Sequence, residues 1–464
     1  MSERGEMAEW SKAVASKAII PRNRDRGFES PSLLQQRVGP GYKSMLKKIL
    51  FFCCLIGNLF QPYLVGMIDN RFLDQYLLYR DPKIYNSDRQ HYTIQPFVMT
   101  AHSGWGNFDD EKTRLFEING SYDQATIDKA LQTSGRTHES LLRSDLSNAL
   151  TSIPWFMRGR LEIYGIGFRA EEMITDCFGI GTVLYYAHGR SRMEMVRNKE
   201  TTRGSILGEG DERELCLLNE EMHQLLGVTP PLWSTTVFGD VDLYLIGKKI
   251  YDYAYKCKHI ELSLKLGTLM PAAPQRNVNN PASIPLGGNR HWGLYGWAEG
   301  YFLLKEDLSC GLFLQVSKRF SRTQCMRIPS LTEPTIYGAI VGPFKVNPGV
   351  TIGFSPYATF ERVREGLGFG LAYTLVAHRE DSLTNLASLP PHITVNETLA
   401  ERRSQWKSEY VTLRAFYDCA FECEMQGRGA LPVVSFLWDI PVNWIIAQGS
   451  YKTHGVSFIV EMRF

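Results

Sequence analysis

The chain has 464 residues and a formal net charge of +2, with 51 Lys and Arg against 49 Asp and Glu. This near-neutral balance argues against a nucleic-acid binder that relies on phosphate contacts. Hydrophobic residues make up 44% and charged residues 22% of the chain, which excludes wholesale disorder. No apolar run reaches the roughly 18 residues that a membrane-spanning helix needs, so a polytopic helical membrane protein is excluded as well.

Residues 1–44 differ from the rest because they are basic and show no sustained periodicity. Two pieces, 5–10 and 27–33, resemble a serine-type tRNA gene read as codons. The common T-arm sequence GGTTCGAATCC can be read to give Gly-Phe-Glu-Ser, and codons for Gly5-Glu6 can pair with codons for Ser32-Leu33 as an acceptor stem does. We therefore interpret 1–44 as a non-native extension, with a disordered basic arm as the alternative.

Met45 is then the natural start of the protein. Lys47 and Lys48 precede an apolar run over 49–60, which is the pattern of a secretory signal peptide over 45–62. We expect export across a bacterial inner membrane, with 63–90 as a periplasmic or plug segment before the first strand.

The clearest strand signal lies at 411–425, where the alternation of side chains far exceeds the usual strand of about 5–6 residues. Apolar residues (Val411, Leu413, Ala415, Tyr417) alternate there with residues that are mostly polar (Thr412, Arg414, Phe416, Asp418). A transmembrane strand needs about 9–11 tilted residues with one apolar face. In a barrel in lipid, the large apolar face points outward and small or polar residues line the interior.

The same pattern recurs along the chain and predicts an all-β fold, an antiparallel transmembrane β-barrel of about twelve strands with short helical inserts. An even number of strands is what single-chain outer-membrane barrels have. The expected strands are 91–102, 157–174, 178–197, 237–256, 259–270, 291–305, 309–328, 345–361, 366–380, 407–425, 430–447 and 454–464.

The C-terminal strand carries the most specific signal. It resembles the assembly signal of Gram-negative outer-membrane proteins, which implies recognition by the barrel assembly machinery and localisation in the outer membrane. The signal residues are Val456, Phe458, Val460, Met462 and the terminal Phe464.

Two inserts interrupt the predicted barrel of 91–464, at 103–156 and 198–236. Helices are expected at 122–132 and 137–150 in the first insert and at 211–226 in the second, with Gly227 as C-cap. Because long loops of outer-membrane barrels face outward, we expect the inserts outside the cell or folded into the lumen.

Charged and polar residues on the inner face are the best functional candidates. One hypothesis is a solute-selectivity role, and the alternative is a structural network of ion pairs that fills a narrow lumen. The lumen-lining candidates are Glu261, Lys265, Arg414, Asp418, Glu422, Asp439, Asn443, Glu461 and Arg463.

The sequence offers no catalytic or metal motif. It has no G-x-S-x-G, H-x-x-H or C-x-x-C pattern, so no catalytic residue, metal or cofactor is assigned. His259 and Ser263 share a strand face, but at about 13 Å along the strand they are too far apart for direct proton transfer.

One resemblance is to a transporter family. Gly239-Asp240-Val241-Asp242-Leu243, the run 264–271 and the loop 280–288 are similar to segments of the MetA-like proteins of phenol degradation, which are related in kind to FadL-type transporters of hydrophobic compounds. The resemblance covers 237–300, and it implies an outer-membrane transporter. The helical insert at 198–236 departs from it, as does the expected count of twelve strands, since FadL-type barrels have fourteen.

We therefore expect an outer-membrane channel or transporter for small molecules, hydrophobic ones included, that is not an enzyme. Two alternatives stay open: a non-conducting surface barrel with interaction loops, and an outer-membrane lipid hydrolase. The expected partners are outer-membrane lipids and the assembly machinery, with no nucleic acid. The sequence does not fix the oligomeric state.

Deleting Phe464 should impair barrel assembly because the terminal aromatic residue is part of the expected signal. Heat-modifiable gel mobility of outer-membrane fractions measures the folded yield, and the Phe464→Tyr variant, which keeps an aromatic terminus, is the control. An undiminished yield of the deletion variant would contradict the interpretation of β-strand 454–464 as an assembly signal.

Overall fold

The computed structural model describes residues 90–106, 112–142, 152–198, 209–252, 257–305, 307–364, 366–419 and 432–463. The chain divides into the units Met1–Tyr63 and Leu64–Phe464, and only the second contains described residues. The expected extension 1–44, signal peptide 45–62 and segment 63–89 therefore lie outside the described residues, as do Glu422 and Phe464.

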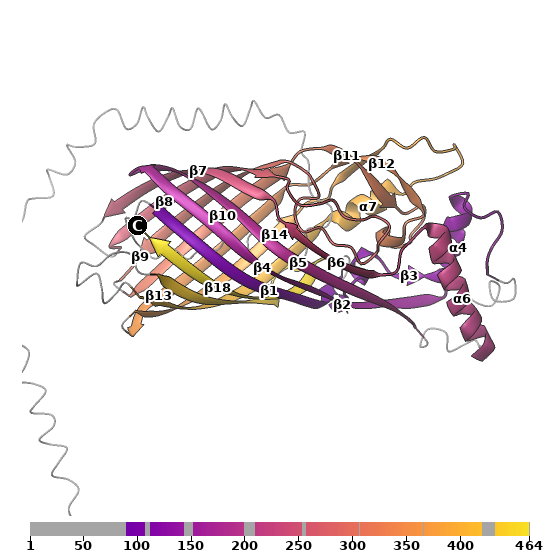
Figure 1. Ribbon diagram of the computed structural model, residues 1–464, viewed down its shortest axis with the longest axis horizontal. Coiled ribbons are helices and arrows are strands. Elements are labelled where there is room, and N and C mark those ends of the chain that lie inside the picture. The colour runs from indigo at the N-terminus through magenta and orange to yellow at the C-terminus, as the bar shows by residue number, and fades with distance from the viewer. Residues whose placement is uncertain are drawn as a thin grey trace, which may run out of the picture. The chain divides into compact units, whose positions relative to one another are not determined.

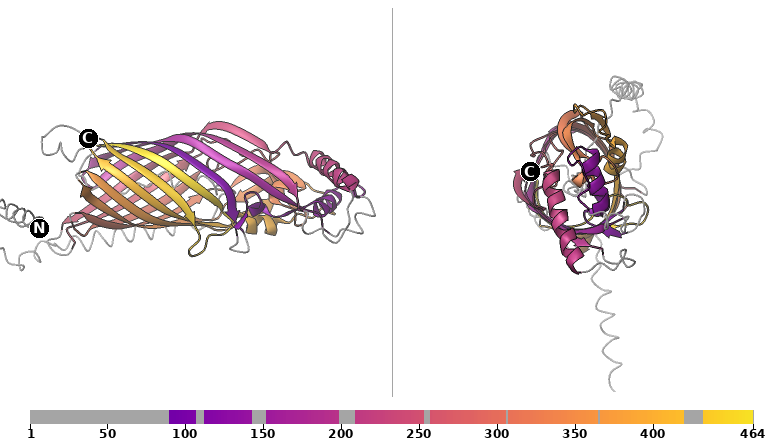
Figure 2. Two further views of the ribbon diagram at one scale, coloured as in Figure 1. Left: turned by 90° about the horizontal axis from the view of Figure 1, so that it is seen from below. Right: turned by 90° about the vertical axis from the view of Figure 1, so that its right-hand side faces the viewer.

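Twelve antiparallel strands form a closed barrel, as the alternating pattern predicts (Figure 1; Figure 2, right). Each strand pairs with its neighbours along the chain, and β1 closes the ring because it pairs with both β4 and β18. The barrel strands are β1 (Gln90–Trp105), β4 (Pro154–Thr175), β5 (Phe178–Arg197), β7 (Val241–Asp252), β8 (His259–Met270), β9 (Gly293–Leu303), β10 (Leu308–Arg319), β13 (Thr351–Arg364), β14 (Leu367–His378), β16 (Trp406–Asp418), β17 (Val433–Val442) and β18 (Tyr451–Arg463).

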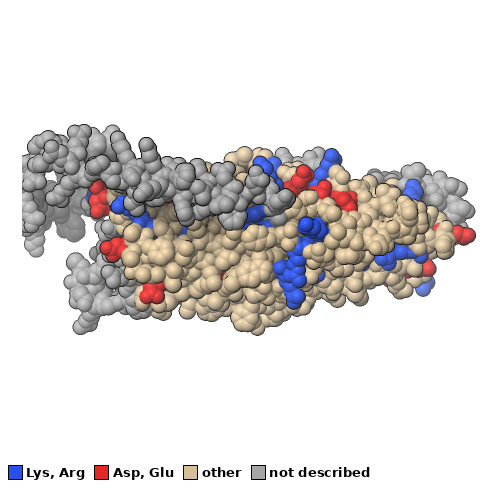
Figure 3. All heavy atoms as spheres, turned by 90° about the horizontal axis from the view of Figure 1, so that it is seen from above, with Lys and Arg blue, Asp and Glu red and all other residues tan. Residues whose placement is uncertain are grey.

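Large apolar side chains cover the outer wall of the barrel. Every barrel strand contributes at least one of them, and in Figure 3 an uncharged band separates charges near the two ends of the wall. This exterior, together with ring closure, is the architecture by which β-proteins cross the bacterial outer membrane. We call this surface the belt; its representatives, one per strand in chain order, are Ile94, Phe168, Ile180, Leu245, Leu264, Leu294, Leu314, Phe354, Leu371, Leu413, Phe436 and Phe458.

The two ends of the barrel differ. Most connections at the end where the C-terminus lies are tight turns, whereas the opposite end carries almost all remaining structure (Figure 1). We call these the turn end and the loop end; short turns are periplasmic in such barrels, so the loop end faces outward. The loop end holds β2 (Lys112–Arg114), η2 (Glu117–Asn119), β3 (Tyr122–Asp123), α4 (Gln124–Thr133), α6 (Glu209–Leu226), β6 (Leu232–Phe238), β11 (Arg322–Ile328), η3 (Thr335–Tyr337), β12 (Ile340–Asn347), β15 (Ser382–Asn385) and α7 (Glu397–Ser404).

Two expected helices are present. The Asp123 side chain caps α4 by accepting a hydrogen bond from the Ala125 N–H at 2.9 Å. After α6, Gly227 has φ +67°, the left-handed conformation that favours glycine at a helix end. The helix expected at 137–150 is wrong over 137–142, which contains bends and no helix; 143–151 lies outside the described residues.

Three expected strands prove to be shorter or divided. Residues 309–328 form β10 and then β11, which leaves the wall to pair with β12. Residues 345–361 divide because Pro348 and Gly349 form a break, where a Cβ on Gly349 would lie 2.0 Å from the Arg379 carbonyl oxygen. The strand expected at 237–256 begins at Val241, because Gly239 packs against the ring of Tyr185 and ends β6. The small sheet of β11, β12 and β15, and helix α7, were not predicted.

Strand β17 also ends earlier than the alternation predicts, whereas residues 420–425 of the strand expected at 407–425 lie outside the described residues. β17 stops at Val442, which pairs with Glu409, whereas Gln448 pairs with Lys407. Residues 443–447 therefore form a wide bulge, and the Glu409 carboxylate accepts hydrogen bonds from backbone N–H groups of 444–446. Asn443 belongs to this bulge, so its expected place on the strand 430–447 is wrong.

Placing a charge on the belt should destabilise the barrel in lipid. Leu371, on the outer face of β14, is 52% exposed, and Leu371→Arg should cost about 2–4 kcal/mol in unfolding from vesicles. Leu217→Arg on α6, which is 60% exposed at the loop end, is the control and should change stability by no more than about 0.5 kcal/mol. Equal effects of the two substitutions would contradict the assignment of the belt to lipid.

Candidate functional site

The barrel interior receives most of the predicted lumen residues. Their side chains are buried on the inner face, each beside a polar partner. Asp418 is half-buried at the turn end of β16, Glu422 and the Arg463 side chain lie outside the described residues, and the buried set is Glu261, Lys265, Arg414, Asp439 and Glu461.

A charged network joins the two sides of the ring closure. His91 on β1 lies with Nε2 2.7 Å from Glu461 on β18 and Nδ1 3.4 Å from Glu171 on β4. The Glu171 carboxylate also lies 2.5 Å from Arg169 and 2.5 Å from Lys265 Nζ. Charges buried in this way are stable only when they are paired. The network therefore supports the hypothesis that these residues form ion pairs that fill a narrow lumen.

Three members of this network are not among the predicted lumen residues. Arg169 and Glu171 stand two positions apart on the expected strand 157–174, which places them on one face, and that spacing was a usable signal. His91 at the start of β1 gave no such signal. Its role follows from the register of β1 against both β4 and β18, which is a long-range property of the closed ring.

A cavity of about 60 Å³ opens off the lumen halfway along the barrel. Its apolar side is formed by Trp297 and Phe313, whose rings meet edge-on at 5.1 Å, and by Leu437. Small residues, Gly370 and Ala372, leave the space open on the β14 side.

The polar groups around this cavity hydrogen-bond to one another. Glu299 accepts a hydrogen bond from Tyr357 at 2.6 Å, and Arg414, a predicted lumen residue, donates to the Ser435 hydroxyl at 2.7 Å. Because these groups already have partners, a solute in the cavity meets mainly aromatic and aliphatic surface. Such a site favours apolar molecules with few polar groups.

The loop end of the barrel is filled by an apolar core. We call its non-barrel elements the plug: residues 115–131, 215–226, 280–288 and 335–339. Their buried side chains pack against inward residues of β1, β4 and β5, such as Met99, Leu161 and Tyr185. In the end-on view, α4 and α6 lie across the barrel mouth (Figure 2, right).

Asp240 anchors the loop 280–288 within the plug. Its side chain is 1% exposed and accepts a hydrogen bond from the Gly288 N–H at 2.6 Å, while Arg319 Nη1 lies 2.6 Å from the same carboxylate. A Cβ at Gly288 would lie 1.6 Å from the Arg319 guanidinium, so a side chain at this position would push Arg319 away from Asp240. The Gly-Asp segment and the loop of the transporter-like resemblance are therefore in direct contact.

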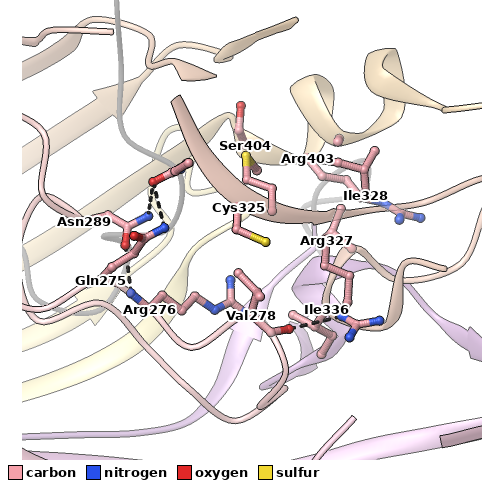
Figure 4. A pocket seen from close by; sticks show the side chains of 14 residues that line it. Gln275, Arg276, Val278, Asn289, Cys325, Arg327, Ile328, Ile336, Arg403 and Ser404 are labelled. Atoms are coloured by element: carbon pink, nitrogen blue, oxygen red, sulfur yellow. Dashed lines mark hydrogen bonds between the residues drawn. The ribbon is translucent and has the colours of Figure 1, made fainter. Parts of the chain in front are cut away.

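Arginines fasten the plug beside a second pocket, also of about 60 Å³ (Figure 4). Arg327 donates to the carbonyl oxygens of Val278, Gly338 and Leu226, the last at the C-terminal end of α6. Burial, reinforced by the neighbouring Arg136, lowers the pKa of Arg327 to about 10, so it stays charged at neutral pH and favours the negative end of the helix dipole.

Arg136 and Arg403 complete this set of ties. Arg136 donates to the carbonyl oxygens of Leu225 at 2.7 Å and Ala339 at 3.0 Å, and Arg403 donates to that of Glu333 at 2.7 Å. These contacts give the arginines a structural role in closing the barrel mouth.

The described residues contain no group of three or more His, Cys, Asp or Glu that could hold a metal ion. No helix among them is both long and apolar enough to cross a membrane. His259 and Ser263, the pair that shares one face of β8, are both buried, and His259 Nδ1 lies 2.8 Å from Asp252.

No protein-family model and no curated protein matches the chain. Matches are found among solved structures. An outer membrane channel from Pseudomonas putida F1 is similar at 10% identity and a TM-score of 0.45, over 83% of this chain and 100% of that one. The toluene transporter TbuX of Ralstonia pickettii has 10% identity, a TM-score of 0.32, and coverage of 82% and 90%. A FadL homologue from Pseudomonas aeruginosa has 8% identity, a TM-score of 0.31, and coverage of 86% and 96%.

Acid should loosen α6 from the rest of the plug. Burial lowers the pKa of His223 to about 4; its Nε2 lies 3.1 Å from the Tyr122 hydroxyl, and its ring stacks on Tyr337. In the unfolded chain the pKa of a histidine is higher, about 6.5. The folded state therefore has its full stability above about pH 6.5, where the ring is neutral in both states. As the pH falls towards 4, the free energy of unfolding decreases by at most about 3 kcal/mol.

Amide hydrogen exchange of α6 at about pH 7 and about pH 4.5 measures this loss, after correction for intrinsic rates. The His223→Gln variant should lose the pH dependence, whereas His188→Gln on the outer wall should retain it. Equal protection of α6 at both pH values in the unmodified chain would refute the role of His223.

Proposed function

We propose that the chain is an outer-membrane channel for small, mainly hydrophobic molecules, closed at its outer end by the plug. The observation that carries the proposal is the mid-barrel cavity lined by Trp297, Phe313 and Leu437. A lumen that served only to stabilise the barrel would gain from filling this space, because a cavity forfeits packing contacts.

The chemistry of the cavity supports an apolar solute. Aromatic rings supply large apolar contact area, and the nearby polar groups are engaged with one another. A strongly hydrated solute would lose its water on entry without gaining equivalent hydrogen bonds. Arg414 and Glu299, at the edge of the cavity, each hydrogen-bond to a hydroxyl group of the protein.

Passage requires the plug to move or loosen. The arginine ties are suited to a reversible closure, because they hold the plug through hydrogen bonds to carbonyl oxygens at its edge. The buried apolar core of the plug, on the other hand, favours the second candidate function, a sealed barrel whose loop end carries an interaction surface. Solute passage distinguishes the two functions.

For assembly, we propose that the barrel assembly machinery recognises β18. Val456, Phe458 and Met462 project from the outer wall of that strand, at 37%, 52% and 40% exposure. Outer-membrane lipids would then surround the folded belt.

Proteoliposomes that contain the full chain should take up a small aromatic solute faster than protein-free vesicles, as a fluorescence quench inside the vesicle measures. Ala372→Phe, which fills the cavity, should reduce uptake towards the protein-free rate. Leu413→Phe on the outer face of the neighbouring strand is the control and should leave uptake unchanged. Arg327→Gln, which removes a plug tie, should increase uptake.

Uptake at the protein-free rate by both the unmodified chain and the Arg327→Gln variant would exclude the channel and leave the sealed barrel. Heat-modifiable gel mobility confirms in each case that the variant barrel is folded. Release of fatty acids from labelled phospholipid by the same vesicles would instead indicate the lipid-hydrolase alternative.

A further inference from the structure

A cluster of arginines lies on the outer wall of the barrel between the belt and the loop end. Arg158 and Arg160 on β4, and Arg190 and Arg192 on β5, are exposed, while their sequence neighbours Met157, Leu161, Ser191 and Met193 are buried on the inner face. Alternation therefore points all four guanidinium groups away from the lumen. With Glu162 and Glu194 on the same face, they form what we call the basic wall patch.

The cross-strand register leaves this patch with excess positive charge. Arg158 stands opposite Glu194, and Glu162 stands opposite Arg190. Arg160 and Arg192, however, stand directly opposite each other, an arrangement that is destabilising in a sheet unless something offsets it. Arg160 forms an ion pair with Glu162 along its own strand, yet its side chain remains 58% exposed. Arginines outnumber glutamates four to two in the patch.

The patch borders the lipid-facing surface. Tyr164 on β4 and Tyr186 on β5 share its outer face and are 53% and 42% exposed at the edge of the belt. Arg160 is four residues from Tyr164, or about 13 Å along the strand. Aromatic residues mark the boundary between hydrocarbon and headgroups in such barrels, so the arginines lie at headgroup level. Because they lie on the loop-end side of the belt, that level belongs to the outer leaflet.

The neighbouring strand β18 adds one more basic residue to this wall. Lys452 on β18 is half-buried against Trp105, with Nζ 3.2 Å from the ring centroid. β18, β1, β4 and β5 are consecutive in the ring, and β5 pairs beyond the belt with β6 (Figure 1).

We propose that the basic wall patch binds the phosphorylated headgroup of an outer-leaflet glycolipid, with the acyl chains lying on the adjoining belt. Guanidinium groups bind phosphate oxygens with paired, charge-assisted hydrogen bonds. A phosphate between Arg160 and Arg192 would remove their repulsion. The continuity of the patch with the belt selects a lipid phosphate over a free phosphate ion, because one molecule then satisfies both surfaces.

This site is separate from the lumen, so it does not depend on the proposed channel. Barrel and plug need not change when the glycolipid binds.

The test uses the full chain in a non-ionic detergent and bis-phosphorylated lipid A as the probe, with native mass spectrometry to count bound lipid. The Arg160→Gln/Arg192→Gln variant should bind lipid A about tenfold more weakly. The Arg160→Lys/Arg192→Lys variant should lose less affinity than the Gln variant, because it keeps the charge but not the paired hydrogen bonds of guanidinium. The Arg213→Gln/Arg402→Gln variant removes two exposed loop-end arginines away from the wall and should bind like the unmodified chain.

Two further experiments vary the lipid and the salt concentration. Dephosphorylated lipid A should bind the unmodified chain as weakly as lipid A binds the double Gln variant, and inorganic phosphate at millimolar concentration should not displace lipid A. Raising salt from about 0.05 to about 0.5 M should weaken binding of the phosphorylated lipid.

Unchanged lipid A affinity of the double Gln variant, tight binding of the dephosphorylated lipid, or displacement by inorganic phosphate would overturn the proposal. If the double variant fails to give a heat-modifiable barrel, the single variants Arg160→Gln and Arg192→Gln carry the same test, each with an expected loss of about threefold. Uptake of an aromatic solute is measured in parallel, because its failure bears on the channel alone.

Discussion

The requirement that every backbone N–H and C=O in the hydrocarbon region be paired within the protein governs this structure. An open sheet would expose two edges to lipid, and β1 removes both by pairing with β4 and β18 at once. The other features follow from that closure. The alternation that the strands need to bury one face and expose the other produces the belt outside and a polar, crowded lumen inside. Even the bulge at 443–447 obeys the requirement, since the Glu409 carboxylate accepts hydrogen bonds from N–H groups that leave the ladder.

Closure also determines what the lumen can hold. Inward charges from opposite sides of a narrow ring must find partners, and the network around Glu171 shows how they do so across β1, β4, β8 and β18. Where aromatic and small residues meet instead, between Trp297 and Ala372, a cavity remains. Towards the loop end the same lumen becomes an apolar core with the plug packed into it. The lumen therefore contains a charged network, an apolar cavity and the plug, one after another along its length. This order is the basis for proposing a closed channel.

The sequence predicts the barrel well because alternation is a local property that each strand displays by itself. Twelve strands could be counted from it, and helices α4 and α6 from their spacing and caps. The short strands β11, β12 and β15 were missed because they hold their shape through contacts with each other, and the breaks at Gly239 and Gly349 were missed because they depend on close approach to Tyr185 and Arg379.

The candidate site could be predicted only as a list of inward residues. Lys265 and Glu461 share the Glu171–His91 network only after the ring has closed, and the cavity draws its lining from strands that are distant in the chain.

Photolabelling of the folded barrel with a small apolar diazirine, with the modified residues mapped by mass spectrometry, tests whether apolar solutes occupy the lumen. Trp297 and Phe313 on the inner faces of β9 and β10 should be labelled, and an excess of unlabelled aromatic solute should reduce their labelling. The belt residues Leu294 and Leu314 on the same strands should be labelled through the lipid and should not respond to competition. Labelling confined to the belt, with Trp297 and Phe313 unmodified, would show that apolar solutes do not occupy the lumen.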